Sequence, residues 1–204
     1  SPLEGKWYSR ILNRDLKISV STITIGNFWP GLLKAKTNFN GCMLAKEFSA
    51  KIFNKWEGCY VEPKCDGIRV IALVSNSGIE LLSRRGKPIT HLQHIEKELK
   101  QFKNRMFDGE MVVYDSPRSN PDRVIDWKTT LALAKARVHV TPELAKKIEQ
   151  CVEYHVFDSM PLKDYLSGGT TKANLKNRKK FLKCLKNLNS VRVLAYKKVN
   201  SVEQ

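Results

Sequence analysis

Hydrophobic and polar positions follow different periods in the two parts of the chain. Trp7, Ile11 and Leu12 share one face at helical spacing, so helix is predicted within the first forty residues. From residue 59 onward, apolar and β-branched runs are separated by turn residues, which is typical of strands. The predicted strands cover 59–62, 68–75, 79–83 and 106–114. The pattern indicates a helical segment followed by a β-rich body.

A helical period returns after residue 90. The segment 90–102 carries an apolar stripe, and Thr90 with Gln93 forms a capping-box pattern at its start. The stripe consists of Leu92, Ile95, Leu99 and Phe102. The run 141–143 (Thr-Pro-Glu) predicts another helix start, because it combines a capping residue, a proline in the first turn and an acid near the helix dipole.

The rest of the chain mixes further helices with strands. Helices are predicted over 126–138 and 174–188, and strands over 152–158 and 190–199. The helix 174–188 is expected to bury Leu175, Leu182, Leu185 and Leu188. Strands and helices do not alternate regularly, so the pattern favours an α+β fold over a doubly wound parallel sheet.

Composition narrows the class of protein. The chain of 204 residues is 42% hydrophobic and 27% charged, which excludes a disordered chain. Apolar runs stay well short of the roughly 18 residues of a membrane span, so no membrane partner is expected. Five cysteines, an odd number without Cys-x-x-Cys spacing, indicate a reducing compartment, and we expect a cytoplasmic protein.

The charge is strongly basic and unevenly placed. Lysine and arginine number 36 against 20 acids, a formal net charge of +16. The stretch 163–198 alone holds eleven basic residues and one acid. A solvated helix face would explain such a stretch, but an excess of this size favours contact with a nucleic acid.

The strongest chemical signal is the segment 62–69 (EPKCDGIR). Lys64 stands between two predicted strands, before an Asp-Gly turn where glycine permits an unusual backbone conformation. A lysine attacks an electrophile only after it loses its proton, which nearby cations such as Arg69 favour. Arg69 could also clamp a phosphate. The alternative is an ordinary hairpin with a charged tip.

Three later segments add charged and aromatic residues to strands. Arg84 lies at a strand end beside Gly86, and Phe157 adjoins an acid in the segment 154–158 (YHVFD). Asp108 and Glu110, two apart in an apolar strand, are expected to share one face. Buried acids need cations, so either a salt bridge to arginine or a divalent metal would satisfy them. By itself, a phenylalanine such as Phe157 belongs to the core more often than to a base-stacking surface.

The four segments, in this order, resemble the nucleotide-binding motifs of the ATP-dependent DNA ligases, within the superfamily of lysine nucleotidyltransferases. The segments 14–16, 29–32 and 43–45 (RDL, WPGL and MLA) are similar to the approach to the adenylation domain in bacteriophage ligases of the T-even type. The resemblance therefore covers nearly the whole chain.

The resemblance implies a role for each motif residue. Lys64 would be the nucleophile that takes AMP from ATP, and Glu62 would accept from the adenine amino group. Arg69 and Arg84 would contact phosphate and ribose, and Phe157 would stack on adenine. Glu110 would contact ribose or Mg²⁺. The implied enzyme seals nicks in double-stranded DNA, as a monomer, during replication, repair or recombination.

The resemblance also implies a domain plan. Residues 1–40 would end an N-terminal DNA-binding domain, and 41–204 would form an adenylation domain of antiparallel sheets flanked by helices. Two further motifs of the family, and its oligonucleotide-binding-fold domain, have no counterpart after Phe157. We therefore expect these 204 residues to be a fragment that is catalytically incomplete by itself.

Two alternatives stay open. Another lysine nucleotidyltransferase, either an mRNA guanylyltransferase or an RNA ligase, would use the same Lys-x-Asp-Gly segment. Glu62 and the segments 29–32 and 43–45 favour DNA ligase over these. A non-catalytic basic DNA-binding module would explain the net charge. It would not explain acids at Glu62, Asp108 and Glu110, which repel phosphate.

Overall fold

The computed structural model describes the chain over residues 59–133 and 140–200, together with 39–44, 47–49, 51 and the isolated positions 4–5, 7–8, 10 and 28. The chain divides into two compact units, Ser1–Lys36 and Thr37–Gln204. The described positions of the first unit are helical. Ile11 and Leu12 of the predicted apolar face lie outside the described residues. The account below concerns the second unit.

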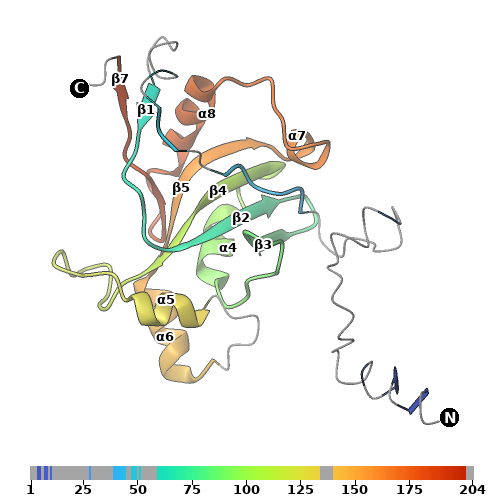
Figure 1. Cartoon of the computed structure of the whole chain (residues 1–204). Helices are drawn as coiled ribbons and strands as arrows, with labels where there is room; N and C mark the ends of the chain where they lie inside the picture. Colours follow the sequence, from blue (N-terminus) through green and yellow to red (C-terminus); the bar gives the residue numbers. More distant parts are fainter. Residues whose placement is uncertain are drawn as a thin grey trace. The chain divides into compact units, whose positions relative to one another are not determined.

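A five-stranded mixed sheet forms the centre of this unit, in the order β3-β2-β4-β5-β6 (Figure 1). Its strands are β2 (Ile68–Val74), β3 (Ile79–Ser83), β4 (Arg105–Val113), β5 (Val152–Pro161) and β6 (Val191–Val193). All neighbours pair antiparallel except β5 and β6, which are parallel. The α+β class is therefore confirmed, with one parallel pair in a sheet that was expected to be antiparallel.

A second, two-stranded sheet pairs β1 (Cys59–Val61) with β7 (Lys197–Val199). The prediction of a single strand over 190–199 is thus wrong, because the chain leaves the edge of β5 after Val193 and pairs again with β1. Tyr196 lies in the connection and packs edge-on against Tyr60, with ring centroids 5.5 Å apart. The local pattern could not reveal this exchange of partners.

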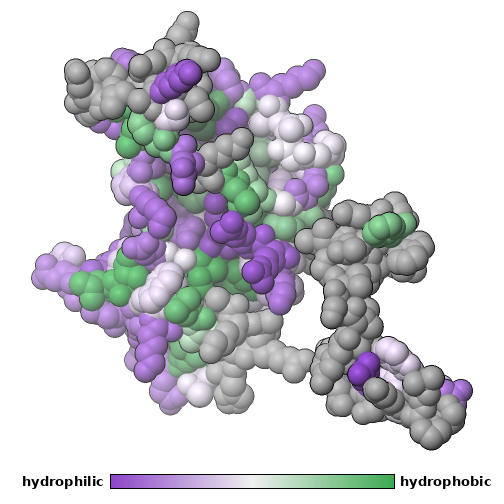
Figure 2. All heavy atoms as spheres, in the orientation of Figure 1, coloured by the Kyte–Doolittle hydropathy of each residue, from purple (hydrophilic) through white to green (hydrophobic). Residues whose placement is uncertain are grey.

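Helices cover the sheet and its ends (Figure 1). They are α4 (Gln93–Leu99), α5 (Trp127–Leu133), α6 (Pro142–Cys151), α7 (Leu162–Leu166), α8 (Leu175–Leu182) and the 3₁₀ turn η1 (Lys183–Leu185). In Figure 1, α5 and α6 lie together at one end, and α8 lies at the other end beside β1 and β7. Figure 2 shows hydrophilic side chains over much of this view, with hydrophobic patches between them.

The sheet is apolar on one face and partly polar on the other. Alternate residues of β2 and β4, such as Val70 and Phe107, pack with Ile95 of α4 and Leu182 of α8 in the main core. The opposite face holds a smaller cluster around Ile71, under α7. That face is left open enough to hold charged groups, and the candidate site lies there.

Two predicted helix starts have opposite outcomes. At α6 the Thr141 side chain accepts from the backbone N–H of Leu144, as the sequence predicts. The capping box at Thr90 is wrong, since α4 begins at Gln93 without a side-chain cap and His91 has a left-handed φ of 75°. The hydroxyl of Thr90 instead contacts the His91 ring, 2.7 Å away.

The helix expected over 174–188 is shorter and tighter at its end. Asn174 caps α8, which ends at Leu182 and continues as η1. Leu182 and Leu185 are buried as predicted, whereas Leu175 is 36% exposed and does not join the core. The buried residue of the first turns of α8 is instead Lys179.

Candidate functional site

One pocket of about 850 Å³ on the open face of the sheet is lined by six of the candidate residues from the sequence. Glu62, Lys64, Arg69, Arg84, Glu110 and Phe157 all contribute to its lining. They come from the β1–β2 loop, from β2, β4 and β5, and from the turn after β3. Positions almost a hundred residues apart in sequence thus meet at one place.

Lys64 projects from the β1–β2 loop into open space. Its side chain is 91% exposed, and its ammonium lies 3.4 Å from the Asp66 carboxylate. The loop returns to the sheet at Gly67, where a Cβ would lie 2.3 Å from the backbone oxygen of Met111. Glycine is therefore required here so that the loop can approach β4 closely, and this approach places Lys64 beside Glu110.

Arg69 on β2 contacts side chains of two other strands, Asp108 on β4 and Phe157 on β5. Its guanidinium binds both carboxylate oxygens of Asp108, at 2.5 and 2.6 Å, and lies 4.6 Å from the centre of the Phe157 ring. Burial raises the pKa of Asp108, and the hydrogen bonds from Arg69 act against that rise. Of the two sequence readings for Asp108, the geometry favours the arginine salt bridge.

Phe157 is the site of a bulge in β5, next to the pocket. Val156 pairs with Gly109 and Asp158 with Asp108, so Phe157 is the extra residue. Before the bulge Tyr154 and Val156 point into the main core, and after it the alternation is reversed. Phe157 lies on the pocket face by simple alternation with Tyr154 and Val156, and the bulge brings the next residue, Asp158, to the same face opposite Asp108.

Glu110 lies opposite Arg69 in the pairing of β2 with β4. Burial raises its pKa, while Arg69, Lys64 and a hydrogen bond from the backbone N–H of Gly67 act to lower it. The described part of the chain contains no group of three or more His, Cys, Asp and Glu residues able to hold a metal. Glu110 could supply one carboxylate ligand to an ion that is bound mainly by other groups.

Glu62 has a partner that the sequence did not suggest. The ammonium of Lys179 on α8 hydrogen bonds to its carboxylate and donates to the backbone oxygen of Phe157 at 2.5 Å. Lys179 is only 3% exposed. Its place in a run of lysines indicated a surface residue, and no local signal distinguishes it from Lys180.

Other lining residues were also missed from sequence. Leu44, Trp127 and Leu194 add apolar surface to the pocket, and Cys65 lies in the same loop as Lys64. Trp127 is 47% exposed at the start of α5. An isolated tryptophan between charged residues gives no pattern from which its position could be predicted.

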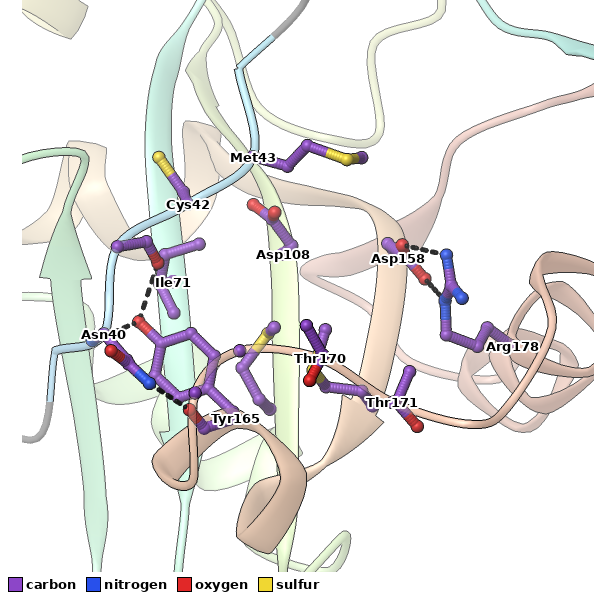
Figure 3. Close-up of a pocket in the computed structure, with 15 residues that line it drawn as sticks. Asn40, Cys42, Met43, Ile71, Asp108, Asp158, Tyr165, Thr170, Thr171 and Arg178 are labelled. Carbon is purple, nitrogen blue, oxygen red and sulfur yellow. Dashed lines mark hydrogen bonds and ion pairs between the residues drawn. The ribbon is translucent and has the colours of Figure 1, made fainter.

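A second hollow of about 430 Å³ is lined by Asp108, the carboxylate that Arg69 binds (Figure 3). Asp158 faces Arg178 there in a two-bond ion pair of 2.8 and 3.0 Å. The Tyr165 hydroxyl donates to the backbone oxygen of Gly41, and Asn40 bonds to Tyr165 in turn. These bonds fix the segment 39–44, which carries Leu44 to the edge of the larger pocket.

Comparison with known proteins now identifies the fold. A structure named Pmar-Lig_Pre has a TM-score of 0.60 and 23% identity, over 97% of this chain and 45% of its own. The ATP complex of the bacteriophage T7 ATP-dependent DNA ligase has a TM-score of 0.52 and 18% identity, over 75% of this chain and 52% of its own. A structure from an analysis of Lig E DNA ligases has a TM-score of 0.53 and 20% identity, over 80% and 53%.

The chain thus spans about half the length of these structures. No curated protein gives a significant match to the sequence. Among the described residues, no helix has the length and apolar character needed to cross a bilayer. A sequence model of the ATP-dependent DNA ligase domain matches residues 42–204, which is most of the chain. By this match the chain belongs to the ATP-dependent DNA ligase domain family.

Proposed function

We propose that this chain carries the nucleotide-binding and lysine-adenylating site of an ATP-dependent DNA ligase. The observation that carries the proposal is the meeting of Lys64 with Glu62, Arg69, Arg84, Glu110 and Phe157 around one pocket. In this proposal Lys64 attacks the α-phosphate of ATP, forms a lysyl–AMP bond and releases pyrophosphate. AMP then passes to a 5′-phosphate at a nick, and the 3′-hydroxyl displaces it.

The pocket suits each part of the nucleotide. The Phe157 ring offers a flat apolar surface for the base, and Glu62 offers an acceptor for its amino group. Arg69 and Arg84 place positive charge where phosphates and ribose would lie. Phosphoryl transfer depends mainly on positioning and on charge neutralisation, which is what this lining provides.

As a nucleophile, the Lys64 side chain must be able to move toward the α-phosphate as well as interact with nearby carboxylates. An exposed, weakly held side chain can swing toward phosphorus, since among the described residues its ammonium contacts only Asp66, at 3.4 Å. Asp66 can also accept the proton that the amine loses before it attacks. The Lys64 ammonium lies close enough to Glu110 to act against the rise in the pKa of that carboxyl caused by burial, so the two groups interact electrostatically.

Magnesium fits this arrangement through Glu110. Mg²⁺ in nucleotide sites is commonly held by one or two carboxylates and by the substrate phosphates, so a complete protein cage is not required. When bound, the ion would neutralise charge on the phosphates during transfer. Glu110 would orient the ion. Arg69 would keep the Asp108 carboxylate in its ion pair, so that Asp108 would not serve as a ligand to the ion.

The wider proposal concerns the protein that contains this chain. We propose nicked double-stranded DNA as its substrate, a monomeric state, and a cytoplasmic role in replication, repair or recombination. Residues 1–40 would end a DNA-binding domain and 41–204 would form the adenylation domain. The basic stretch 163–198 and the net charge of +16 support a polyanionic partner.

The decisive experiment is labelling of the full-length protein with α-labelled ATP and magnesium, followed by denaturing electrophoresis. Lys64→Arg and Lys64→Ala should both abolish the labelled band. Arginine keeps its proton and lacks a free lone pair, and alanine lacks the nitrogen. Both variants should still seal a nick that already carries a 5′-adenylate. A labelled band from Lys64→Arg would exclude Lys64 as the nucleophile, and labelling by GTP instead of ATP would favour a guanylyltransferase.

A further inference from the structure

Lys179 is a buried charged side chain that bonds two lining residues of the 850 Å³ pocket, Glu62 and Phe157. Its ammonium bonds the Glu62 carboxylate and the Phe157 carbonyl, and lies 5.3 Å from the centre of the Tyr196 ring. Its side chain is 4% exposed, whereas that of Glu62 is 24% exposed. The lysine is therefore hidden from solvent, and the acid that it holds faces the pocket.

Burial of an ammonium is costly unless strong acceptors surround it. Lys179 meets this condition with one carboxylate, one carbonyl and one aromatic face, which lie on three different segments. Two of these anchors, Phe157 and Tyr196, belong to the body of the domain. The third, Glu62, stands in the loop before Lys64, so the ammonium ties this loop to the body.

We propose that Lys179 is a positioning residue that sets the preference of the pocket for adenine. It acts by fixing the Glu62 carboxylate as an acceptor at the base edge, and this inference rests on the function proposed above. Lys179 itself does not touch the nucleotide. One carboxylate oxygen of Glu62 is engaged by the ammonium, which leaves the other for the base.

A fixed carboxylate discriminates between purines by simple hydrogen-bond chemistry. The 6-amino group of adenine is a donor and pairs with it, whereas the 6-oxygen of guanine is an acceptor and is repelled. A carboxylate that can turn toward solvent loses both effects. The pairing with Lys179 should therefore raise the ATP-to-GTP affinity ratio and leave contacts with the triphosphate unchanged.

The test measures equilibrium binding of three nucleotides to the full-length protein: ATP, GTP and purine riboside triphosphate, which has hydrogen at position 6. Lys179→Met keeps the buried stem and removes the charge. We expect its ATP-to-GTP affinity ratio to fall about tenfold, the size of one hydrogen bond to a charged group. Affinity for the purine analogue should stay unchanged. Lys146→Met on the exposed surface of α6 is the matched control and should retain the wild-type ratio.

Two further variants separate positioning from general stability. A purely structural role would reduce the binding-competent fraction equally for all three nucleotides, which leaves the ratio intact and overturns the proposal. Lys179→Arg should restore part of the ratio, because it returns a cation to Glu62. In a Glu62→Gln background, Lys179→Met should no longer alter the ratio, and an undiminished effect there would also overturn the proposal.

The outcomes also distinguish this inference from the function beneath it. Wild-type protein that binds ATP selectively, with a Lys179→Met variant of equal selectivity, overturns the role of Lys179 alone. Wild-type protein that binds none of the three nucleotides overturns the proposed function, and the inference with it. Thermal unfolding of each variant identifies any that fail to fold, and Lys179→Arg then provides the measurement.

Discussion

At the scale of single residues, the site depends on close approaches that permit little change. Gly67 touches β4 so tightly that any side chain would meet backbone, and Gly109 lies under the Tyr154 ring in the same way. Tyr154 in turn donates to the backbone oxygens of Val70 and Phe107. The geometry around Lys64 and Phe157 is therefore set by packing beneath the pocket as much as by the pocket residues.

Replacement of Gly67 tests this dependence. In Gly67→Ala the new Cβ would lie 2.3 Å from the Met111 oxygen and 2.7 Å from Cγ of Glu110, so strand or loop must shift. We expect a loss of about 1–3 kcal/mol in the free energy of unfolding, measured by denaturant titration. Gly78→Ala is the control, because nothing lies within 4 Å of its Cβ position. Equal stability of the two variants would contradict the close approach.

Glu153 predicts a pH dependence at the same scale. This buried carboxylate on β5 bonds His155 at 3.1 Å and Arg123 at 2.8 Å, and Arg192 lies 3.4 Å away. Burial alone would raise its pKa, but the bonds from His155 and Arg123 prevail and lower it from 4.5 to about 2. Because the folded-state pKa is depressed, the stabilisation is complete above the unfolded value and is lost as pH falls toward 2.

Glu153→Gln should therefore cost most near neutral pH, about 1–3 kcal/mol in the free energy of unfolding, because it leaves the partly buried Arg123 without its carboxylate partner. The deficit relative to wild type should shrink as pH falls from about 4.5 toward 2. Urea unfolding at several pH values measures it. A deficit that stays constant over this range would show that the ion pairs contribute nothing.

At the scale of elements, Asp126 links α5 with α6. The Asp126 carboxylate accepts from the backbone N–H of Thr129 at 2.9 Å, in the first turn of α5, and from Lys147 of α6 at 2.6 Å. The bond from Lys147, followed by those from Thr129, lowers the pKa of Asp126 to about 2. One side chain thus both caps a helix and pairs two helices.

Two substitutions separate these roles. Asp126→Asn keeps a capping oxygen and removes the charge, so it should cost little, below about 1 kcal/mol for a partly exposed ion pair. Asp126→Ala removes both functions and should cost about 1–2 kcal/mol. Thermal unfolding of the two variants and of the wild type measures their relative stabilities. If the asparagine variant is as unstable as the alanine variant, the ion pair rather than the cap holds α5.

At the scale of the whole molecule, positive charge is the dominant feature. The lysines of the stretch 163–198 are not equivalent, since Lys179 is buried and Arg178 is paired with Asp158. Others remain exposed, among them Lys176, Lys183 and Lys186. These exposed lysines, and not the whole stretch, are available to contact the phosphates of the DNA substrate proposed above.

Neutral substitution of these three lysines should weaken binding to nicked duplexes of any sequence alike. Each lost phosphate contact should flatten the slope of log affinity against log salt by about 0.9, because fewer counterions are released. Fluorescence anisotropy at several salt concentrations measures the slope. Lys103→Gln, outside the stretch, should leave it unchanged. An unchanged slope for the triple variant would mean that these lysines form only a solvated face.

Local patterns were sufficient for much of the fold and for the candidate site. The strands β2, β3 and β4 and the start of α6 follow from alternation and from capping chemistry, because these depend on neighbouring residues alone. The ordered motifs identified the residues that line the pocket, since short-range spacing reflects the turns and strands that carry them. Their chemical roles stay predictions.

Tertiary structure decided what depends on distant partners. The bulge that brings Asp158 to the face of Asp108 exists only in the pairing of β4 with β5, and the split of residues 190–199 exists only because the chain pairs first with β5 and then with β1. Lys179 reads as a surface lysine because its acceptors lie 117 and 22 residues away along the chain. The sequence determined which chemical side chains are present and the periodicity of apolar residues that forms the individual strands and helices. Burial and long-range pairing determined which of them meet, because those energies belong to the folded chain as a whole.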